Sequence, residues 1–250
     1  MAQLRQELQT RDDFLAAAAH DLKNPLASIK GAAQLLQLRR ARPEGLDEQQ
    51  LRAGLERIDA ITTRATGQLD ELLDLARMQM GRPLDLSYQS IDLVALAREA
   101  VVEHQQRSER HQLSLESRVS ELIGPWDGRR LARVLANLLD NALKYSPDGG
   151  TIRVEVSRDD GPPGVGVLTV EDQGVGIPEE DLGRIFERFQ RGTNVVGEIA
   201  GTGIGLASAR HIVESHGGSI TAVSRPRRGA TFTVRLPLET ADVHTWEPRA

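Results

Sequence analysis

The stretch GLASARHIVESHGGSITAVSRPRRGATFTVRL, residues 205–236, decides the fold class. Residues 205–215 have the apolar spacing of a helix, whereas 219–223 and 230–236 alternate as strands do. One helix is therefore followed directly by two strands, without the regular strand–helix–strand alternation of a doubly wound sheet. The segment predicts an α+β fold in which helices and a sheet form a two-layer sandwich.

The preceding residues continue this mixture of elements. Asp92 and Asp127 stand where N-caps are expected, directly before helical patterns. Gly81-Arg82-Pro83 is the expected linker ahead of this region, so we predict a sandwich domain over 83–238 and a polar tail over 239–250. The further predicted elements are helices over 93–104 and 127–145 and strands over 112–117, 151–157 and 165–171.

Residues 1–82 have the period of paired helices. Apolar residues at alternating spacings of four and three form heptad seams on either side of a breaker segment at 39–46. Because Ile61, Leu73 and Leu75 widen the second stripe, a lone hairpin would leave apolar surface exposed. We therefore expect a homodimer in which two hairpins form a four-helix bundle. The seam residues are Leu15, Ala19, Leu22, Leu26, Ile29, Ala33 and Leu36, then Leu51, Leu55, Ile58, Thr62, Ala65, Leu69, Leu72 and Ala76.

Composition limits the class of partner. The formal net charge of −5 argues against nucleic acid, so we expect no nucleic-acid partner. The absence of cysteine excludes disulfides and thiolate metal sites. The longest apolar run, residues 14–19, is far too short to span a bilayer. We expect a cytoplasmic chain, and a longer parent protein could have membrane or sensor segments upstream of Met1 that are absent from this chain.

His20 lies in the run AAAAHDLKNPL at residues 16–26. It comes one place after the seam residue Ala19, so the imidazole is expected to face solvent. A carboxylate follows at Asp21, and Pro25 loosens the helix one turn later. This arrangement is typical of a histidine that is reached from outside and chemically modified.

A polar ridge is predicted on the helix that contains NLLDNALKY, residues 137–145. Asn137, Asn141 and Lys144 are spaced by four and three residues, so they share one helix face. Two amide oxygens and an ammonium suit a magnesium ion and phosphate groups. An ordinary polar helix face is the alternative, and this segment alone does not separate the two.

Two glycine-rich segments have the residues of a nucleotide site. Asp172 ends an apolar strand and is followed by Gly174 and Gly176, which suits a carboxylate that accepts from an exocyclic amine beside closely approaching backbone. The alternative is a simple turn. Residues 201–206, GTGIGL, suit an anion at a helix N-terminus, but Leu206 occupies the third glycine position of a dinucleotide-binding motif.

Phe186 and Phe189 lie between these glycine segments and precede the looser stretch 191–200. A flap tethered by aromatic side chains could close over a nucleotide. The alternative is a surface helix with two ordinary core anchors.

The order of these motifs resembles the catalytic core of bacterial sensor histidine kinases over about residues 11–237. His20-Asp21-Leu22-Lys23-Asn24-Pro25-Leu26 is similar to the family's phosphoacceptor box, and the asparagine ridge is similar to its N box. Residues 172–176 and 201–206 are similar to its two glycine boxes, and 186–189 to its F box. The resemblance implies a phosphotransfer hairpin joined to an ATP-binding sandwich of the gyrase and heat-shock-chaperone type.

The resemblance also implies a role for each matching residue. His20 would be phosphorylated from ATP, Asp21 would orient its ring, and the product would pass its phosphoryl group to an aspartate of a response regulator receiver domain. Asn137 and Asn141 would hold Mg²⁺, and Lys144 would contact phosphate. Asp172 would accept from the adenine amine. The other implied nucleotide-site residues are Tyr145, Gly174, Gly176, Gly201, Gly203, Gly205, Leu206 and Thr231, the last supporting Asp172.

The acceptor box differs from the family's commonest form at two positions. Asp21 replaces the more usual glutamate, and Asn24 replaces threonine. The resemblance implies that Asn24 positions a water that attacks the phosphorylated regulator, so phosphatase activity is expected as well. The remaining histidines are expected to be surface or capping residues: His104, His111, His211, His216 and His244.

Two other classes of function use the same sandwich. An ATPase or chaperone-like relative would not need His20 in its box. A nucleotide-sensing dimer that no longer transfers phosphate would not need the intact set of Asn141, Asp172 and the glycines.

Overall fold

The computed structural model divides the chain into two compact units, Met1–Met80 and Gly81–Ala250. His20, Asp21, Asn24 and Gly201 lie outside the described residues. The described residues are 25–40, 47–79, 84–161, 164–195, 199 and 203–239.

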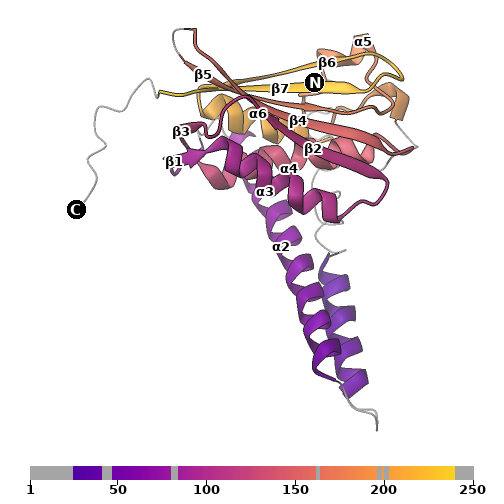
Figure 1. The fold of residues 1–250 in the computed structure, drawn as a ribbon. Helices are drawn as coiled ribbons and strands as arrows, with labels where there is room; N and C mark the ends of the chain where they lie inside the picture. Colours follow the sequence, from indigo (N-terminus) through magenta and orange to yellow (C-terminus); the bar gives the residue numbers. More distant parts are fainter. Residues whose placement is uncertain are drawn as a thin grey trace, which may run out of the picture. The chain divides into compact units, whose positions relative to one another are not determined.

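The described part of the first unit is a pair of helices, one over residues 25–40 and the other α2 (Glu48–Gln79) (Figure 1). Asp47 caps α2, because its Oδ1 accepts a hydrogen bond of 2.6 Å from the Gln50 amide. Gly54 lies against the side chain of Leu36, where a Cβ atom would collide with it. The glycine therefore allows the two helices to approach closely at this point.

The second unit is built on a five-stranded sheet with the order β2-β4-β5-β7-β6. Only the β2–β4 pair is parallel, and the other neighbours are antiparallel. A separate antiparallel pair joins β1 (Gln89–Asp92) to β3 (Ile123–Trp126). The strands of the main sheet are β2 (His111–Ser117), β4 (Gly150–Asp159), β5 (Val165–Glu171), β6 (Ser219–Ser224) and β7 (Ala230–Pro237).

Three helices cover one face of this sheet (Figure 1). They are α3 (Leu93–Gln106), α4 (Gly128–Lys144) and α6 (Gly205–Ser215), and α4 packs against both of the others. Two short elements complete the unit, α5 (Glu179–Leu182) and the 3₁₀ helix η1 (Thr193–Val195). The N-cap prediction is confirmed at both sites, since Asp92 accepts from Val94 and Asp127 from Arg130.

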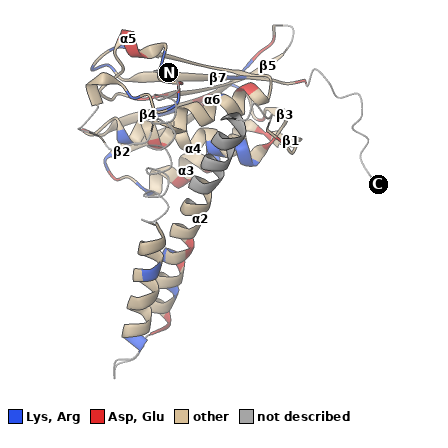
Figure 2. Cartoon of the chain, turned by 180° about the vertical axis from the view of Figure 1, so that it is seen from behind, with Lys and Arg blue, Asp and Glu red and all other residues tan. Residues whose placement is uncertain are grey.

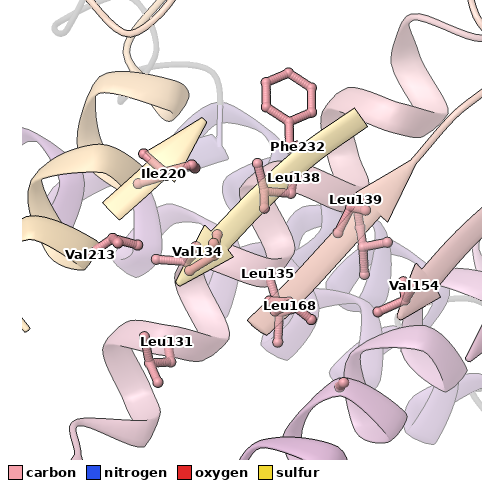
Figure 3. Packing of buried hydrophobic residues seen from close by; sticks show 14 of the residues in the cluster. Leu131, Val134, Leu135, Leu138, Leu139, Val154, Leu168, Val213, Ile220 and Phe232 are labelled. Atoms are coloured by element: carbon pink, nitrogen blue, oxygen red, sulfur yellow. The ribbon is translucent and has the colours of Figure 1, made fainter. Parts of the chain in front are cut away.

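The core lies between α4 and the sheet (Figure 3). The buried side chains of α4 recur every three or four residues, so they form one apolar face toward Val154, Leu168 and Phe232. Burial of each such leucine contributes about 1.5–3 kcal/mol relative to exposure. The buried α4 residues are Leu131, Val134, Leu135, Leu138, Leu139 and Ala142.

The other face of the sheet is polar. Arg153 forms ion pairs with Glu116 on β2 at 3.1 Å and with Glu171 on β5 at 3.5 Å. Thr169, Thr233 and Thr221 are directly opposite one another across β5, β7 and β6. Basic and acidic residues are interspersed over the described part of the chain (Figure 2).

The predicted α+β class is confirmed, because a helical unit precedes a mixed sheet covered by helices. The β1–β3 pair and α5 were not predicted. The expectation for His104 is wrong: its side chain is buried within the last turn of α3. Among the described helices, none is long and apolar enough to cross a bilayer.

Candidate nucleotide-binding site

The polar ridge of α4 lies away from its buried leucines. Asn137, Asn141 and Lys144 are all half-buried, in contrast to the fully buried Leu138 and Leu139 beside them. The helix ends at Lys144, whose Nζ lies 5.0 Å from the centroid of the Tyr145 ring. The core contacts of α4 thus hold three polar side chains and an aromatic ring at one edge of the helix layer.

Asn137 joins this ridge to the second glycine segment. Its Nδ2 donates a hydrogen bond of 3.2 Å to the carbonyl oxygen of Gly205, the first residue of α6. A Cβ atom at Gly205 would lie 3.4 Å from Asn137 Oδ1, which is ordinary van der Waals contact, so this approach does not itself require glycine. Because the nitrogen is committed to Gly205, Oδ1 is the atom that Asn137 can offer to a cation.

Asp172 follows directly on β5 and is buried. Its Oδ1 accepts from the backbone amides of Gly174 at 2.8 Å and Ala230 at 3.2 Å. Burial raises the pKa of this carboxyl, and the two hydrogen bonds oppose the rise only in part. Both donors use the same oxygen, so Oδ2 can accept from a ligand such as an exocyclic amine.

The two glycines after Asp172 are required by close backbone contacts. A Cβ atom at Gly174 would collide with the carbonyl oxygen of Tyr145, which accepts a hydrogen bond of 2.9 Å from Val175. Gly176 has φ +68° and lies against the carbonyl oxygen of Arg225. The first glycine segment is thereby fixed between the end of α4 and the β6–β7 turn.

Ser146 is a candidate residue that the sequence reasoning missed. Its Oγ is buried and has no hydrogen-bond partner among the described residues. It lies beside Gly174, since a Cβ atom there would be 2.7 Å from it. A buried unpaired hydroxyl costs about 1–3 kcal/mol, which a polar ligand or water at this place would offset. Only its position directly after Tyr145 could have suggested it.

The phenylalanine segment contacts the second glycine segment. Phe189 has φ +62°, and its amide donates a hydrogen bond of 3.0 Å to the carbonyl oxygen of Gly203, which itself has φ +71°. Phe186 packs edge-on against Phe232 of β7 with ring centroids 6.3 Å apart. Farther along, Asn194 Nδ2 donates to the carbonyl oxygen of Gly176 at 2.9 Å. The loop is therefore tied to both glycine segments.

The position of Thr231 gives its expected role little support. It is opposite Glu171 in the β5–β7 ladder and is half-buried. The residue that contacts Asp172 on this strand is Ala230, which accepts from its amide at 2.9 Å and donates to its Oδ1. Thr231 therefore lies beside the site, and among the described residues no hydrogen bond joins it to Asp172.

The chemistry of these residues fits a nucleotide with a magnesium ion. Within the described ranges, no group of three or more His, Asp or Glu side chains could hold a metal alone. A hard cation here would therefore depend on amide oxygens such as those of Asn137 and Asn141, with phosphate oxygens and water. The described site residues brought together in this unit are Asn137, Asn141, Lys144, Tyr145, Asp172, Gly174, Gly176, Gly203, Gly205 and Leu206.

Comparison with known families accounts for both units. Residues 126–240 match the family described as "Histidine kinase-, DNA gyrase B-, and HSP90-like ATPase", and residues 10–81 match the "His Kinase A (phospho-acceptor) domain". The chain belongs to the sensor histidine kinases. The second match includes His20, which lies outside the described residues.

Relatives of this kinase core agree with the two matches. The probable sensor histidine kinase TcrY of Mycobacterium tuberculosis is 37% identical over 237 residues, which is 94% of this chain and 46% of TcrY. This kinase core therefore spans less than half of that relative. The mycobacterial sensor histidine kinase MprB has a solved structure with TM-score 0.54 and 28% identity, covering 60% of this chain and 97% of that one.

A more distant solved structure supports the fold alone. It is the histidine kinase ThkA in complex with the response regulator protein TrrA, with TM-score 0.58 and 23% identity. The likeness covers 94% of this kinase core and 64% of that chain.

Asp172→Asn tests the buried carboxylate. Its raised pKa means that the folded chain binds the proton more tightly than the unfolded chain, so its contribution to stability falls as pH rises through that pKa. The amide still accepts from Gly174 and Ala230 but cannot ionise. Without nucleotide, we expect a higher urea midpoint than wild type at neutral pH and no difference in acid. ATP affinity should fall by about tenfold or more, the loss expected for a hydrogen bond to a charged group.

Urea denaturation and equilibrium titration with ATP measure the two effects. Asp148→Asn, at an exposed position of the same unit, is the matched control and should change neither quantity. A variant that binds ATP as the wild type does would contradict the assignment of Asp172.

Proposed function

We propose that this chain is the catalytic core of an ATP-dependent protein-histidine kinase that phosphorylates His20 and passes the phosphoryl group to an aspartate of a response regulator receiver domain. The observation that carries the proposal is the convergence of Asp172, Gly174 and Tyr145 at one end of α4 and of Asn137 with Gly205 along it. The His Kinase A match across His20 supplies the acceptor.

In this proposal the sandwich unit binds ATP. Asp172 Oδ2 accepts from the exocyclic amine of adenine, and Gly174 admits the base to the backbone. Tyr145 lines the pocket, with Lys144 directed to phosphate. Asn137 and Asn141 offer amide oxygens to Mg²⁺, which when bound neutralises charge on the phosphates.

The glycines at the start of α6 form the other side of this site. In this proposal Gly201, Gly203 and Gly205 shape the lid, and Leu206 follows Gly205 in the first turn of α6. Thr231 retains at most a supporting role through the sheet. The amino end of α6 also provides backbone amides, which favour an anion.

His20 is the proposed nucleophile. A neutral imidazole nitrogen attacks the γ-phosphorus, the new N–P bond forms, and the bond from phosphorus to the β,γ-bridging oxygen breaks, with that electron pair leaving on ADP. Asp21 accepts the proton of the other ring nitrogen, which sets the tautomer and stabilises the positive charge that develops. An ordinary imidazole, with a pKa of about 6.5, is largely neutral at pH 7, so the nucleophile is available.

Each part of the chain has its own role in this proposal. Residues 1–82 serve as the dimerisation and phosphotransfer hairpin, residues 83–238 as the ATP-binding domain, and 239–250 as a polar tail. ThkA, which shares this fold, is known in complex with a response regulator, and this supports the same class of partner here. We place the kinase core in the cytoplasm, downstream of a sensor domain.

Exposed leucines support a homodimer. Leu26, Leu38 and Leu55 of the helical unit are 63%, 65% and 54% exposed, which is unusual for several leucines on one pair of helices. Leu26 and Leu55 belong to the heptad seams. Two hairpins that form a four-helix bundle would bury such side chains.

The dimer is tested by Leu55→Glu. We expect the wild-type chain to sediment as a dimer at micromolar concentration and the variant to dissociate at least about tenfold more readily, since burial of one leucine is worth about 1.5–3 kcal/mol. Thr63→Glu adds the same charge at an exposed position of α2 and should leave the dimer intact. Sedimentation velocity that shows only monomer for the wild type would contradict the proposal.

The acceptor is tested by His20→Gln. With γ-labelled ATP and magnesium, the wild type should gain a label that is lost in acid and stable in base, and His20→Gln should reduce the label to background. His244→Gln should keep it. Retained ATP binding by His20→Gln, measured by titration, shows that the site is intact. Label that persists in this variant, or wild type that binds ATP without labelling, would favour a nucleotide-sensing dimer or another phosphoacceptor.

Phosphatase activity is tested separately by Asn24→Ala. If Asn24 positions the attacking water, the variant should dephosphorylate the receiver domain about a hundredfold more slowly, within the range for a positioned catalytic group, and should still autophosphorylate. The assay follows loss of label from a receiver domain that the wild type has phosphorylated. Equal rates for the two proteins would refute the role.

A further inference from the structure

His216 is a buried histidine that the proposed chemistry does not use. It is the C-cap of α6, and its side chain reaches the amino end of α4. Its Nδ1 lies 2.8 Å from the carbonyl oxygen of Ile212, and its Nε2 lies 3.0 Å from the backbone nitrogen of Asp127. Both ring nitrogens are therefore engaged, on two different helices.

These two contacts specify one form of the ring. A carbonyl oxygen can only accept, so Nδ1 must carry the hydrogen toward Ile212. The backbone N–H of Asp127 can only donate, so Nε2 must carry no hydrogen and act as the acceptor. The imidazolium form would place an N–H against another N–H. The geometry thus requires a neutral imidazole, in agreement with burial, which lowers the pKa of His216.

Asp127 extends the contact to the segment that follows the linker. Its Oδ1 caps α4 through the Arg130 amide, and its Oδ2 accepts a hydrogen bond of 3.1 Å from the Ser87 amide. Arg130 Nη2 donates to the carbonyl oxygen of Asp85, and the Tyr88 ring packs edge-on against His216 at 5.8 Å. Residues 85–88 come soon after residues 81–83, so the chain from the helical unit enters the second unit at this cluster.

The charged and titratable groups facing His216 come from two elements. On α4 and its cap they are Arg130 and Asp127, which are within 3.5 Å of each other, and on the incoming segment the titratable group is Tyr88. Asp127 favours a proton on His216 and Arg130 disfavours it. Burial is the largest influence and lowers the pKa of His216, although the hydrogen bond to the Ile212 carbonyl also favours the proton. The neutral ring agrees with the contact between Nε2 and the Asp127 amide.

The cluster acts at one end of α6, and the nucleotide site lies at the other. α6 has 11 residues, about 16 Å of helix. Hydrogen bonds join it to α4 or its cap at three places: Gly205 with Asn137, Ser208 with Arg133, and His216 with Asp127. The His216 bond is the one of these three at the carboxyl end of the helix, next to the buried residues Ile212 and Val213. Without the His216 bond, the remaining hydrogen bonds hold α6 to α4 only toward its amino end, so the helix can tilt and change the angle at which Gly205 meets Asn137.

We propose that neutral His216 is a positioning residue for nucleotide binding, because it clasps α6 to α4 and, through Asp127, to the incoming segment at residues 85–88. Protonation of the ring opens this clasp and weakens the nucleotide site. The inference rests on the proposed ATP function for its binding readout, and its structural part is independent of that function.

Two substitutions separate the contacts of the ring. His216→Gln can keep an acceptor near the position of Nε2 and cannot be protonated near neutral pH, whereas His216→Asn keeps a donor near the position of Nδ1 and loses the acceptor for Asp127. Affinity for Mg²⁺-ATP is measured by titration from about pH 7.5 down to about pH 5, because burial lowers the pKa of His216 below the ordinary imidazole value of about 6.5. Glu214→Gln, an exposed change on the same helix, is the matched control.

We expect His216→Gln and Glu214→Gln to bind ATP like the wild type at the higher pH, and His216→Asn to bind about tenfold more weakly. On acidification the wild type and Glu214→Gln should lose about three- to tenfold more affinity than His216→Gln, since each pKa unit between two states is a factor of ten. Protonation of ATP affects its binding to all of these proteins equally, so it does not contribute to the difference between them. Equal losses in wild type and His216→Gln, or wild-type affinity in His216→Asn, would overturn the clasp.

Nitrogen NMR of the wild-type imidazoles tests the clasp without variants or ATP. The His216 ring should show the Nδ1–H tautomer at neutral pH, and its titration should shift the amide resonances of Asp127 and Ser87. An imidazolium at neutral pH, or amides that do not respond, would overturn the inference. A wild-type chain that shows the expected NMR behaviour and binds no ATP at any of these pH values would instead contradict the proposed function.

Discussion

The site depends on the packing of α4 against the sheet. Leu135, Leu138 and Leu139 are fully buried there, and this apolar contact orients the whole helix. Because a helix is rigid, fixing one face also fixes the opposite edge, where Asn137 and Asn141 lie. The same amphipathic helix therefore both stabilises the core and positions the polar ridge.

Backbone contacts then assemble the rest of the site around α4. The carbonyl oxygen of Tyr145 receives the Val175 amide, and Gly174 passes so close that any side chain would collide with it. Asp172 takes two backbone amides on one oxygen and so keeps the other for a ligand. The close contact at Gly174 leaves no room for a side chain, so glycine is required there. The two amide hydrogen bonds to Asp172 offset part of the cost of burying its carboxylate.

The division of a kinase core into a helical unit and a sandwich unit separates two physical tasks. The helical unit matches a phospho-acceptor domain across His20, and its described helices have exposed leucines suited to pairing with a second copy. The sandwich unit holds its polar groups in a packed frame suited to a nucleotide. His216 and Asp127 stand where the chain passes into that frame, so a group outside the nucleotide site can still influence it.

Local patterns in the sequence determined the helices, the main strands and the N-caps Asp92 and Asp127, because these depend on neighbours within a few residues. They also singled out Asp172 and the asparagine ridge as candidate site residues, and this assignment stays a prediction. The short β1–β3 pair escaped prediction since Gly124 and Pro125 are poor strand formers. Only the tertiary structure decided that Asn137 meets Gly205, that Ser146 is buried, and that His104 and His216 lie in the interior. Each of these depends on chain segments far apart in the sequence, whose approach is decided by packing of the whole domain.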